Sequence, residues 1–159
     1  MAVVTVARIT PADHDEWLNL FQQWHRYLSG SVPMAGLERA WQLLCEETSG
    51  LLGLIARTDA GESVGLAHAS LTPFAWAGGP ILYLQDLFVT AAARGQGVGG
   101  VLLNAVYSLA DEKGASQVFW LADEKDADLL RFYGRQPAVR THHVRFMRHH
   151  WPWFEPGTH

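Results

Sequence analysis

Cysteine and long apolar runs are scarce in this sequence. Its 159 residues include one cysteine, Cys45, so no internal disulfide bond can form. No stretch approaches the roughly 20 consecutive apolar residues that a membrane span requires. The first residues also lack the basic start that is typical of a signal peptide. We therefore expect a cytoplasmic protein without a membrane partner.

Positive charge is outnumbered as well. Lysine and arginine together number 12 against 16 aspartate and glutamate residues, which gives a formal net charge of −4 at pH 7. Nucleic-acid-binding domains favour strongly basic faces, so we expect no nucleic-acid partner. The 48% hydrophobic composition is ordinary for a globular protein, and we expect residues 1–159 to form a single domain.

The carboxyl-terminal region is rich in histidine and tryptophan. The segment THHVRFMRHHW contains paired histidines but no carboxylate or cysteine that would complete a usual ligand set, so we expect no metal site. Trp151, Trp153 and Phe154 follow, and such aromatic side chains need burial on the chain's own core or on a partner subunit. We therefore expect a homodimer.

Hydrophobic periodicity predicts a mixed α/β chain with the element order β-α-α-β-β-β-α-β-α-β. Thr10, Pro11 and Asp13 form the sequence signature of a helix start. Cys45 falls in the second helix, where we expect a core thiol without a nucleophilic role. We expect strands over 2–9, 51–58, 63–71, 81–89, 116–122 and 139–149, helices over 11–28, 35–47, 98–113 and 126–135, and a loop over 72–80.

The segment RGQGVGG, residues 94–100, leads directly into an apolar helix pattern. A glycine-rich turn at a helix start exposes backbone N–H groups beside the positive end of the helix dipole, which favours a phosphate. Arg94 adds a guanidinium that can pair with phosphate oxygens. A tight strand-to-helix turn without a ligand is the alternative interpretation.

Gly95, Gly97 and Gly100 also satisfy the dinucleotide-binding pattern G-x-G-x-x-G, and Asp123 ends the next expected strand. Two observations argue against that interpretation. Residues 90–94 separate the strand from the first glycine, and too few residues follow Asp123 for a doubly wound fold. The GxxxxGK[ST] nucleotide loop is absent, because no Lys-Ser or Lys-Thr follows the glycines.

Two stretches resemble the GNAT superfamily of acetyl-CoA-dependent N-acetyltransferases. LYLQDLFVTAAARGQGVGGVLLNAV resembles its motif A, and FWLADEKDADLLRFYGRQPA resembles its second signature. The pattern LYLxDxFV…RGxGxG…FY is similar to that of the spermidine/spermine and thialysine N-acetyltransferase branch. The resemblance implies one α/β (α+β mixed) domain, with a mostly antiparallel mixed sheet of about six to seven strands flanked by about four helices.

The resemblance also implies roles for matched residues. Backbone groups of Leu87, Phe88 and Val89 would meet the pantetheine arm and the acetyl carbonyl of acetyl-CoA. Asp126 and Leu129 would flank the far side of the cofactor. The residues implied to wrap the pyrophosphate are Arg94, Gly95, Gln96, Gly97, Val98, Gly99 and Gly100.

Acetyl transfer from a thioester to an amine needs a polarised carbonyl, an amine that has lost its extra proton, and a proton for the leaving thiolate. The resemblance implies Tyr133 as the general acid. A phenol has a pKa of about 10 and a thiol a pKa of about 8.5, so proton transfer from Tyr to the thiolate is slightly unfavourable in water. The positioning of the two groups in the site must therefore favour the transfer. An ordinary tyrosine at a helix end is the alternative.

The general base is not assigned by these patterns. In the polyamine branch a glutamate precedes the aspartate of the strand motif, but here that position is Gln85, and an amide takes no proton. Leu28 likewise replaces an acidic residue after Tyr27, and both changes remove negative charge that a polyamine would need. Alternation places Asp86 on the opposite strand face from Gln85 unless a bulge intervenes. His68 is a candidate base acting through a water; a structural histidine, or an ordered water chain without a single base, are the alternatives.

These expectations combine into one functional hypothesis. We expect transfer of the acetyl group of acetyl-CoA to a primary amine of a small molecule, by direct attack in a ternary complex. Tyr27, Gln85 and Trp120 are expected to contact the amine substrate. Acetylation of a peptide or protein amine is one alternative, and a non-catalytic acyl-CoA-binding module is another.

Overall fold

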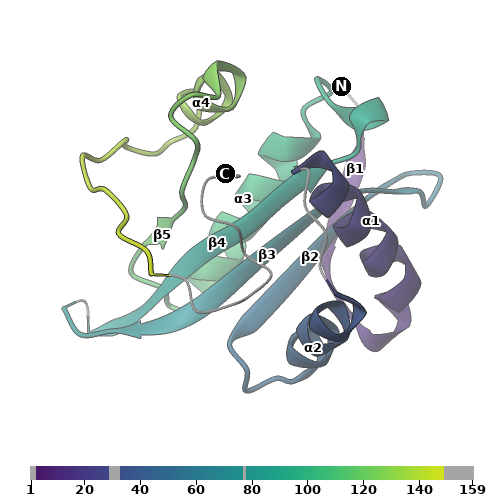
Figure 1. The fold of residues 1–159 in the computed structure, drawn as a ribbon, viewed down its shortest axis with the longest axis horizontal. Helices are drawn as coiled ribbons and strands as arrows, with labels where there is room; N and C mark the ends of the chain where they lie inside the picture. Colours follow the sequence, from purple (N-terminus) through teal and green to yellow (C-terminus); the bar gives the residue numbers. More distant parts are fainter. Residues whose placement is uncertain (1–2, 29–32, 77, 149–159) are drawn as a thin grey trace. The chain divides into compact units, whose positions relative to one another are not determined.

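A five-stranded sheet organises the protein in a computed structural model that describes residues 3–28, 33–76 and 78–148. The chain forms two compact units, residues 1–120 and 121–159. The first unit contains the sheet and three α-helices (Figure 1). Within the described ranges no helix is both long and apolar enough to cross a membrane.

The strands of the sheet lie in sequence order, β1-β2-β3-β4-β5. Neighbouring strands are antiparallel from β1 to β4, while β4 and β5 are parallel. Parallel neighbours need a crossover, and the long helix α3 between β4 and β5 supplies it. The strand bounds are β1 Val4–Arg8, β2 Leu51–Thr58, β3 Ser63–Phe74, β4 Gly79–Val89 and β5 Val118–Phe119.

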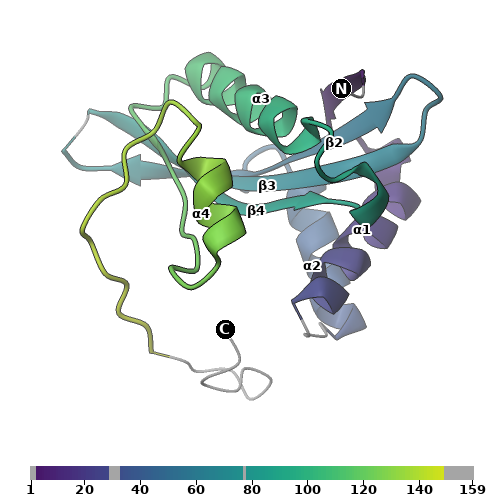
Figure 2. The same cartoon turned by 90° about the horizontal axis from the view of Figure 1, so that it is seen from above.

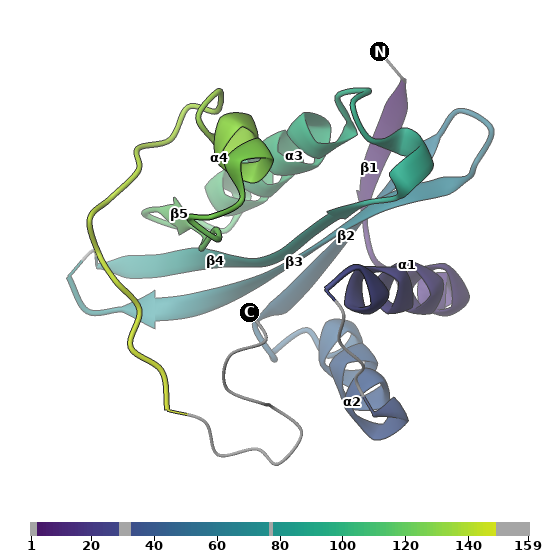
Figure 3. The same cartoon turned by 45° about the horizontal axis from the view of Figure 1, so that its top comes forward.

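Helices cover both faces of the sheet (Figure 2). α1 (His14–Tyr27) and α2 (Met34–Cys45) lie on one face (Figure 3). The Trp17 and Trp41 rings of these two helices are 5.1 Å apart. α3 (Val98–Glu112) lies on the other face and buries an apolar stripe, as its periodicity predicts. Between α1 and the sheet, Trp17, Leu20 and Phe88 belong to one buried cluster with residues of β2 and β3.

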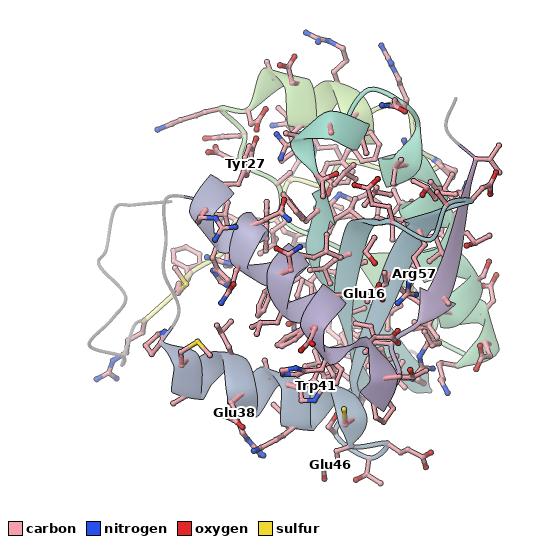
Figure 4. All side chains as sticks on the ribbon, turned by 90° about the vertical axis from the view of Figure 1, so that its right-hand side faces the viewer. Glu16, Tyr27, Glu38, Trp41, Glu46 and Arg57 are labelled. Carbon is pink, nitrogen blue, oxygen red and sulfur yellow. The ribbon has the colours of Figure 1, made fainter. Side chains whose placement is uncertain are left out.

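The start of α1 is fixed by the residues that predict it. A short 3-10 turn, Pro11–Asp13, precedes the helix, and the Asp13 carboxylate accepts hydrogen bonds from the N–H and hydroxyl of Thr10. Arg57 of β2 pairs with Asp13 at 2.6 Å and with Glu16 at 2.8 Å, and Figure 4 shows Glu16 and Arg57 on adjoining elements. These ion pairs connect the start of α1 to β2.

Several boundaries differ from the sequence-based expectations. The expected loop over 72–80 is the end of β3 and the start of β4, which pair as a long hairpin. Only Val118 and Phe119 of the expected strand 116–122 pair with a neighbour. Cys45 is exposed rather than in the core, because it is the last residue of α2.

The strand expected over 139–149 is wrong for its described part. Residues 139–148 form no strand, and Val144 and Phe146 are exposed. A strand needs a backbone partner, and the described residues provide none for this segment. The described part of the chain therefore has five strands and four α-helices, fewer strands than the six to seven expected. His149, Trp151, Trp153 and Phe154 lie outside the described residues.

The second unit contains α4 (Ala127–Tyr133), which confirms the helix predicted over 126–135. Asp126 caps it, because its carboxylate accepts the Leu129 N–H at 2.9 Å. Arg131 pairs with Asp128 one turn away at 2.7 Å. Tyr133 is the last helical residue, and its ring lies 5.0 Å from that of Phe132.

Candidate active site

A β-bulge in β4 decides which side chains face α1. His68 of β3 pairs with Asp86, but the next residue, Ala69, pairs with Leu84, so Gln85 is an extra residue in β4. Regular alternation would put Asp86 on the face of Leu84, toward α3. The extra residue instead puts Asp86 beside His68, on the face that α1 covers, while Gln85 is exposed.

A chain of hydrogen bonds joins α1 to these two residues. The indole N–H of Trp17 donates to His68 Nε2 at 2.8 Å, and that of Trp24 donates to Asp86 Oδ1 at 2.8 Å. Because His68 Nε2 accepts a hydrogen bond, the ring hydrogen lies on Nδ1, which donates to Asp86 Oδ2 at 2.9 Å. Both nitrogens of this buried ring are therefore engaged, which favours the structural interpretation of His68 over the base.

Each oxygen of Asp86 also accepts a hydrogen bond. Burial raises its pKa, but the hydrogen bond and attraction of His68 and the hydrogen bond of Trp24 outweigh burial, so the pKa lies below its ordinary value of 3.8. The group is a carboxylate at neutral pH, and each of its oxygens accepts an N–H. It is a poor proton acceptor for an incoming amine.

His25, on the last turn of α1, was not singled out by its sequence context. Its ring meets that of Phe21 edge-on at 4.5 Å, and its buried Nε2 has no hydrogen-bond partner among the described residues. Burial lowers the pKa of His25 below 6.5; attraction to Asp86 opposes this shift and His68 adds to it. The i, i+4 spacing from Phe21 was the available signal, because it extends the stripe of α1 that faces the sheet.

The outer edge of β4 is open beyond the bulge. β4 pairs with β5 only at Leu82 and Tyr83, so no described strand lies along this edge over residues 84–89. Alternate backbone N–H and C=O groups of an edge strand point outward and can bond an extended ligand as another strand would. Among the described residues no strand therefore pairs with the outer edge of the strand end at which Leu87, Phe88 and Val89 are expected to meet acetyl-CoA.

The glycine segment follows this edge and begins α3. Gly95 and Gly97 have φ of +75° and +88°, a region that disfavours other residues. Residues 94–97 form a turn, and the Gly97 carbonyl accepts the N–H groups of Gly100 and Val101 at the start of α3. A Cβ on Gly95 or Gly100 would enter open space, with nothing within 4 Å. The first N–H groups of an α-helix have no acceptor within the helix, so the positive end of this 15-residue helix, beside open space, fits a pyrophosphate.

Arg94 joins the glycine segment to α1. Its Nε–H donates to the Val89 carbonyl at 3.0 Å, and its guanidinium lies 4.3 Å above the ring of Tyr27. Tyr27 in turn stacks on Trp24, and Figure 4 shows it at the carboxyl end of α1. A pocket of about 350 Å³ opens here, lined by Gln23, Arg26, Tyr27, Phe88, Ala91 and Arg94.

The remaining predicted site residues lie elsewhere. Gln85 is at the bulge, and Trp120 follows β5, with its ring 6.4 Å from that of Tyr107 on α3. The three expected substrate residues, Tyr27, Gln85 and Trp120, thus come from three different elements. Asp126, Leu129 and Tyr133 belong to the second unit, where Asp126 and Leu129 form the cap of α4.

Comparison with known proteins identifies relatives along most of the chain. Residues 14–136 match the acetyltransferase (GNAT) family. The D-amino-acid N-acetyltransferase HPA3 of Saccharomyces cerevisiae is 30% identical over 146 residues, which cover 91% of this chain and 90% of the yeast protein. This relative belongs to the superfamily expected from the sequence, but it does not single out the spermidine/spermine and thialysine branch.

Solved structures share the fold. An aminoglycoside acetyltransferase, meta-AAC0020 from an uncultured soil metagenomic sample, aligns with a TM-score of 0.80 at 23% identity and covers 93% of this chain and 97% of its own. AAC(6')-Iy, solved with a CoA-containing bisubstrate analog, aligns with a TM-score of 0.78 at 21% identity, over 94% and 100%. The expectations of an enzyme and of acetyl-CoA are confirmed: this chain belongs to the acetyltransferase (GNAT) family and is an acetyl-CoA-dependent N-acetyltransferase.

Proposed function

We propose that this enzyme acetylates a primary amine of a small molecule by direct attack of the amine in a ternary complex. The observation that supports this most is the continuity of the open β4 edge with the glycine segment. An extended thioester arm and its pyrophosphate need these two features in series. The carbonyl at the strand end would then lie beside outward backbone N–H groups, which can stabilise the negative charge that develops on its oxygen.

Acetyl-CoA supplies an activated acetyl group, and the chain's own residues orient it. In this proposal the N–H groups of residues 95–99 bind the pyrophosphate, and Arg94 adds positive charge beside them. Backbone groups of Leu87, Phe88 and Val89 bind the pantetheine arm. Tyr133 would protonate the leaving thiolate, with Asp126 and Leu129 on the far side of the cofactor; these roles rest on the family's second signature.

Among small amines, we propose amino acids as the first class to test. The yeast relative is named for D-amino acids, and Arg26 and Arg94 are among the residues that line the pocket beside Phe88. A planar guanidinium matches a carboxylate, and two positive charges disfavour a polyamine. Gln85 and Leu28 also argue against a polyamine, because neither supplies the negative charge that a polyamine would need.

The test is thiol release from acetyl-CoA over a panel of D- and L-amino acids, thialysine, polyamines, aminoglycosides and short peptides. Turnover of one small-amine class is expected, with at least a tenfold lower kcat in Tyr133→Phe. Phe132→Leu, on the same helix, is the matched control and should retain turnover within a few-fold. Turnover of peptides alone would contradict the small-molecule assignment, and an unchanged Tyr133→Phe would remove the acid.

A further inference from the structure

Arg94 is an exposed arginine whose side chain is held by contacts on both its Nε–H and its guanidinium plane. The Nε–H donates to the Val89 carbonyl at 3.0 Å. The guanidinium lies 4.3 Å above the centre of the Tyr27 ring and 5.7 Å from that of Phe88. Its terminal NH₂ groups have no acceptor among the described residues, so they remain available for an anion.

Tyr27 is itself held by the last turns of α1. Its ring stacks on that of Trp24, with 5.8 Å between the centroids and 15° between the planes. The Trp24 N–H donates to Asp86 Oδ1 at 2.8 Å. Side-chain contacts thus run from β4 through α1 to Arg94, which bonds back to β4 at Val89. The path begins and ends on the strand end that the proposed acetyl-CoA arm follows.

We propose that Tyr27 is a positioning residue for acetyl-CoA: its ring holds the Arg94 guanidinium beside the glycine segment, where the free NH₂ groups bind the pyrophosphate. This inference rests on the proposed function, which assigns the pyrophosphate to that segment. A long side chain that is already held in its bound position loses less conformational entropy when the ligand arrives. The Tyr27 ring therefore strengthens acetyl-CoA binding without touching it, a role different from the amine contact expected from the sequence.

The face of an aromatic ring suits this purpose, because it attracts a cation and leaves the edge of the guanidinium free. The attraction acts within about 6 Å of the ring centroid, and the 4.3 Å distance lies well inside that limit. At an exposed site it corresponds to about a two- to fivefold change in a binding constant. Tyr27 is 56% exposed, so a smaller side chain leaves no buried cavity. The ring rather than the hydroxyl makes these contacts, so phenylalanine should replace tyrosine.

Calorimetry of acetyl-CoA binding to the full chain tests the proposal. Tyr27→Leu should raise the Kd about three- to fivefold, whereas the matched variant Tyr27→Phe should stay within about 1.5-fold of wild type. Arg94→Gln should weaken binding further. The double variant should bind as weakly as Arg94→Gln alone, because without Arg94 the ring has no cation to position. Trp76→Leu removes another exposed ring, on the turn between β3 and β4, and should bind as wild type does. Additive losses in the double variant would overturn the proposal.

Nuclear magnetic resonance gives a readout that needs no ligand. Protons above the face of an aromatic ring resonate upfield, so the Arg94 side-chain protons should be shifted upfield in wild type and in Tyr27→Phe. The shift should disappear in Tyr27→Leu, which retains an apolar side chain but no ring. A wild-type spectrum without the upfield shift would overturn the proposal, because Arg94 would then not lie on Tyr27.

Steady-state kinetics separate this role from a contact with the amine. Tyr27→Leu should raise KM for acetyl-CoA about three- to fivefold and leave KM for the amine within about twofold. A change confined to KM for the amine would overturn the proposal and restore Tyr27 to the substrate. If Tyr27→Leu does not fold, as its unfolding midpoint reports, Tyr27→Met replaces it. Wild-type binding of acetyl-CoA with an unaffected Tyr27→Leu refutes the inference alone, whereas acetyl-CoA binding without turnover of any small amine refutes the proposed function.

Discussion

Asp86→Asn tests the hydrogen-bonded chain that joins α1 to the sheet. Two N–H groups, from Trp24 and His68, each donate to a separate oxygen of the carboxylate. Asparagine offers one oxygen, so one donor must face the amide NH₂. If His68 exchanged its ring hydrogen to accept from that NH₂, its Nε2–H would face the Trp17 N–H. Every arrangement therefore leaves one buried pair of donors in conflict.

The size of the effect follows from that count. A hydrogen bond to a charged group contributes about 1.5–3 kcal/mol, and a buried donor left without an acceptor costs about 1–3 kcal/mol. We expect Asp86→Asn to lower the free energy of unfolding by about 2–3 kcal/mol at pH 7, as measured by urea denaturation. Asp59→Asn, on the exposed turn between β2 and β3, is the control and should change it by less than about 0.5 kcal/mol.

The pH dependence of this difference gives a second criterion. The pKa of Asp86 is lowered in the folded protein, so its carboxylate stabilises the fold fully above the unfolded-state pKa of about 3.8. That contribution is lost as pH falls through the lower folded-state pKa. The gap between wild type and Asp86→Asn should therefore be constant from pH 7 to 5 and shrink below pH 4. A gap under about 0.5 kcal/mol at pH 7, or one that grows in acid, would refute the reasoning.

Three further substitutions separate stability from ligand binding. Gly100→Ala should raise the unfolding midpoint, because alanine is favoured over glycine in a helix by up to about 1 kcal/mol. The same variant should weaken acetyl-CoA binding measured by calorimetry, because the added Cβ enters the open space beside the glycine segment. Gly97→Ala should also weaken acetyl-CoA binding, but unlike Gly100→Ala it should lose about 1–2 kcal/mol of stability, since the φ of Gly97 is +88°. Equal unfolding midpoints for the two variants would contradict this prediction. Arg26→Gln should raise KM for amino acids several-fold and leave it unchanged for amines without a carboxylate; a change confined to the KM for acetyl-CoA would assign the pocket to the phosphates instead.

Much of the fold is predictable because its elements satisfy local rules. The cap at Thr10, the stripe of α3 and the order of the first nine elements each follow from a few neighbouring residues. The short β5 and the missing last strand are not local properties. Whether residues 139–148 pair depends on a partner edge elsewhere, and side-chain alternation cannot reveal whether that edge exists.

The candidate site likewise contains features that follow from local sequence and features that depend on distant partners. The glycine segment and Arg94 are recognisable because a turn with positive φ at a helix start requires glycines in a fixed spacing. The bulge at Gln85 is invisible in LYLQDLFV, which has the composition of a continuous buried strand. One extra residue reverses the face of every later side chain, so the surroundings of Asp86 could be stated only as alternatives. His25 was missed for a related reason: only the folded structure shows which nitrogens already have partners.

The bulge and Asp86 depend on each other. If β4 ran without the bulge, Asp86 would pair with Ala67 and take the place of Leu87 on the α3 face, beside the buried Leu84, where burial of a carboxylate is costly. With the extra residue it lies opposite His68 and accepts the Trp24 N–H. That arrangement uses both oxygens of Asp86 and both nitrogens of His68 for structure, which leaves His25 as the titratable group on this face with a vacant nitrogen among the described residues. The extra residue in β4 therefore determines which polar groups hold α1 against the sheet.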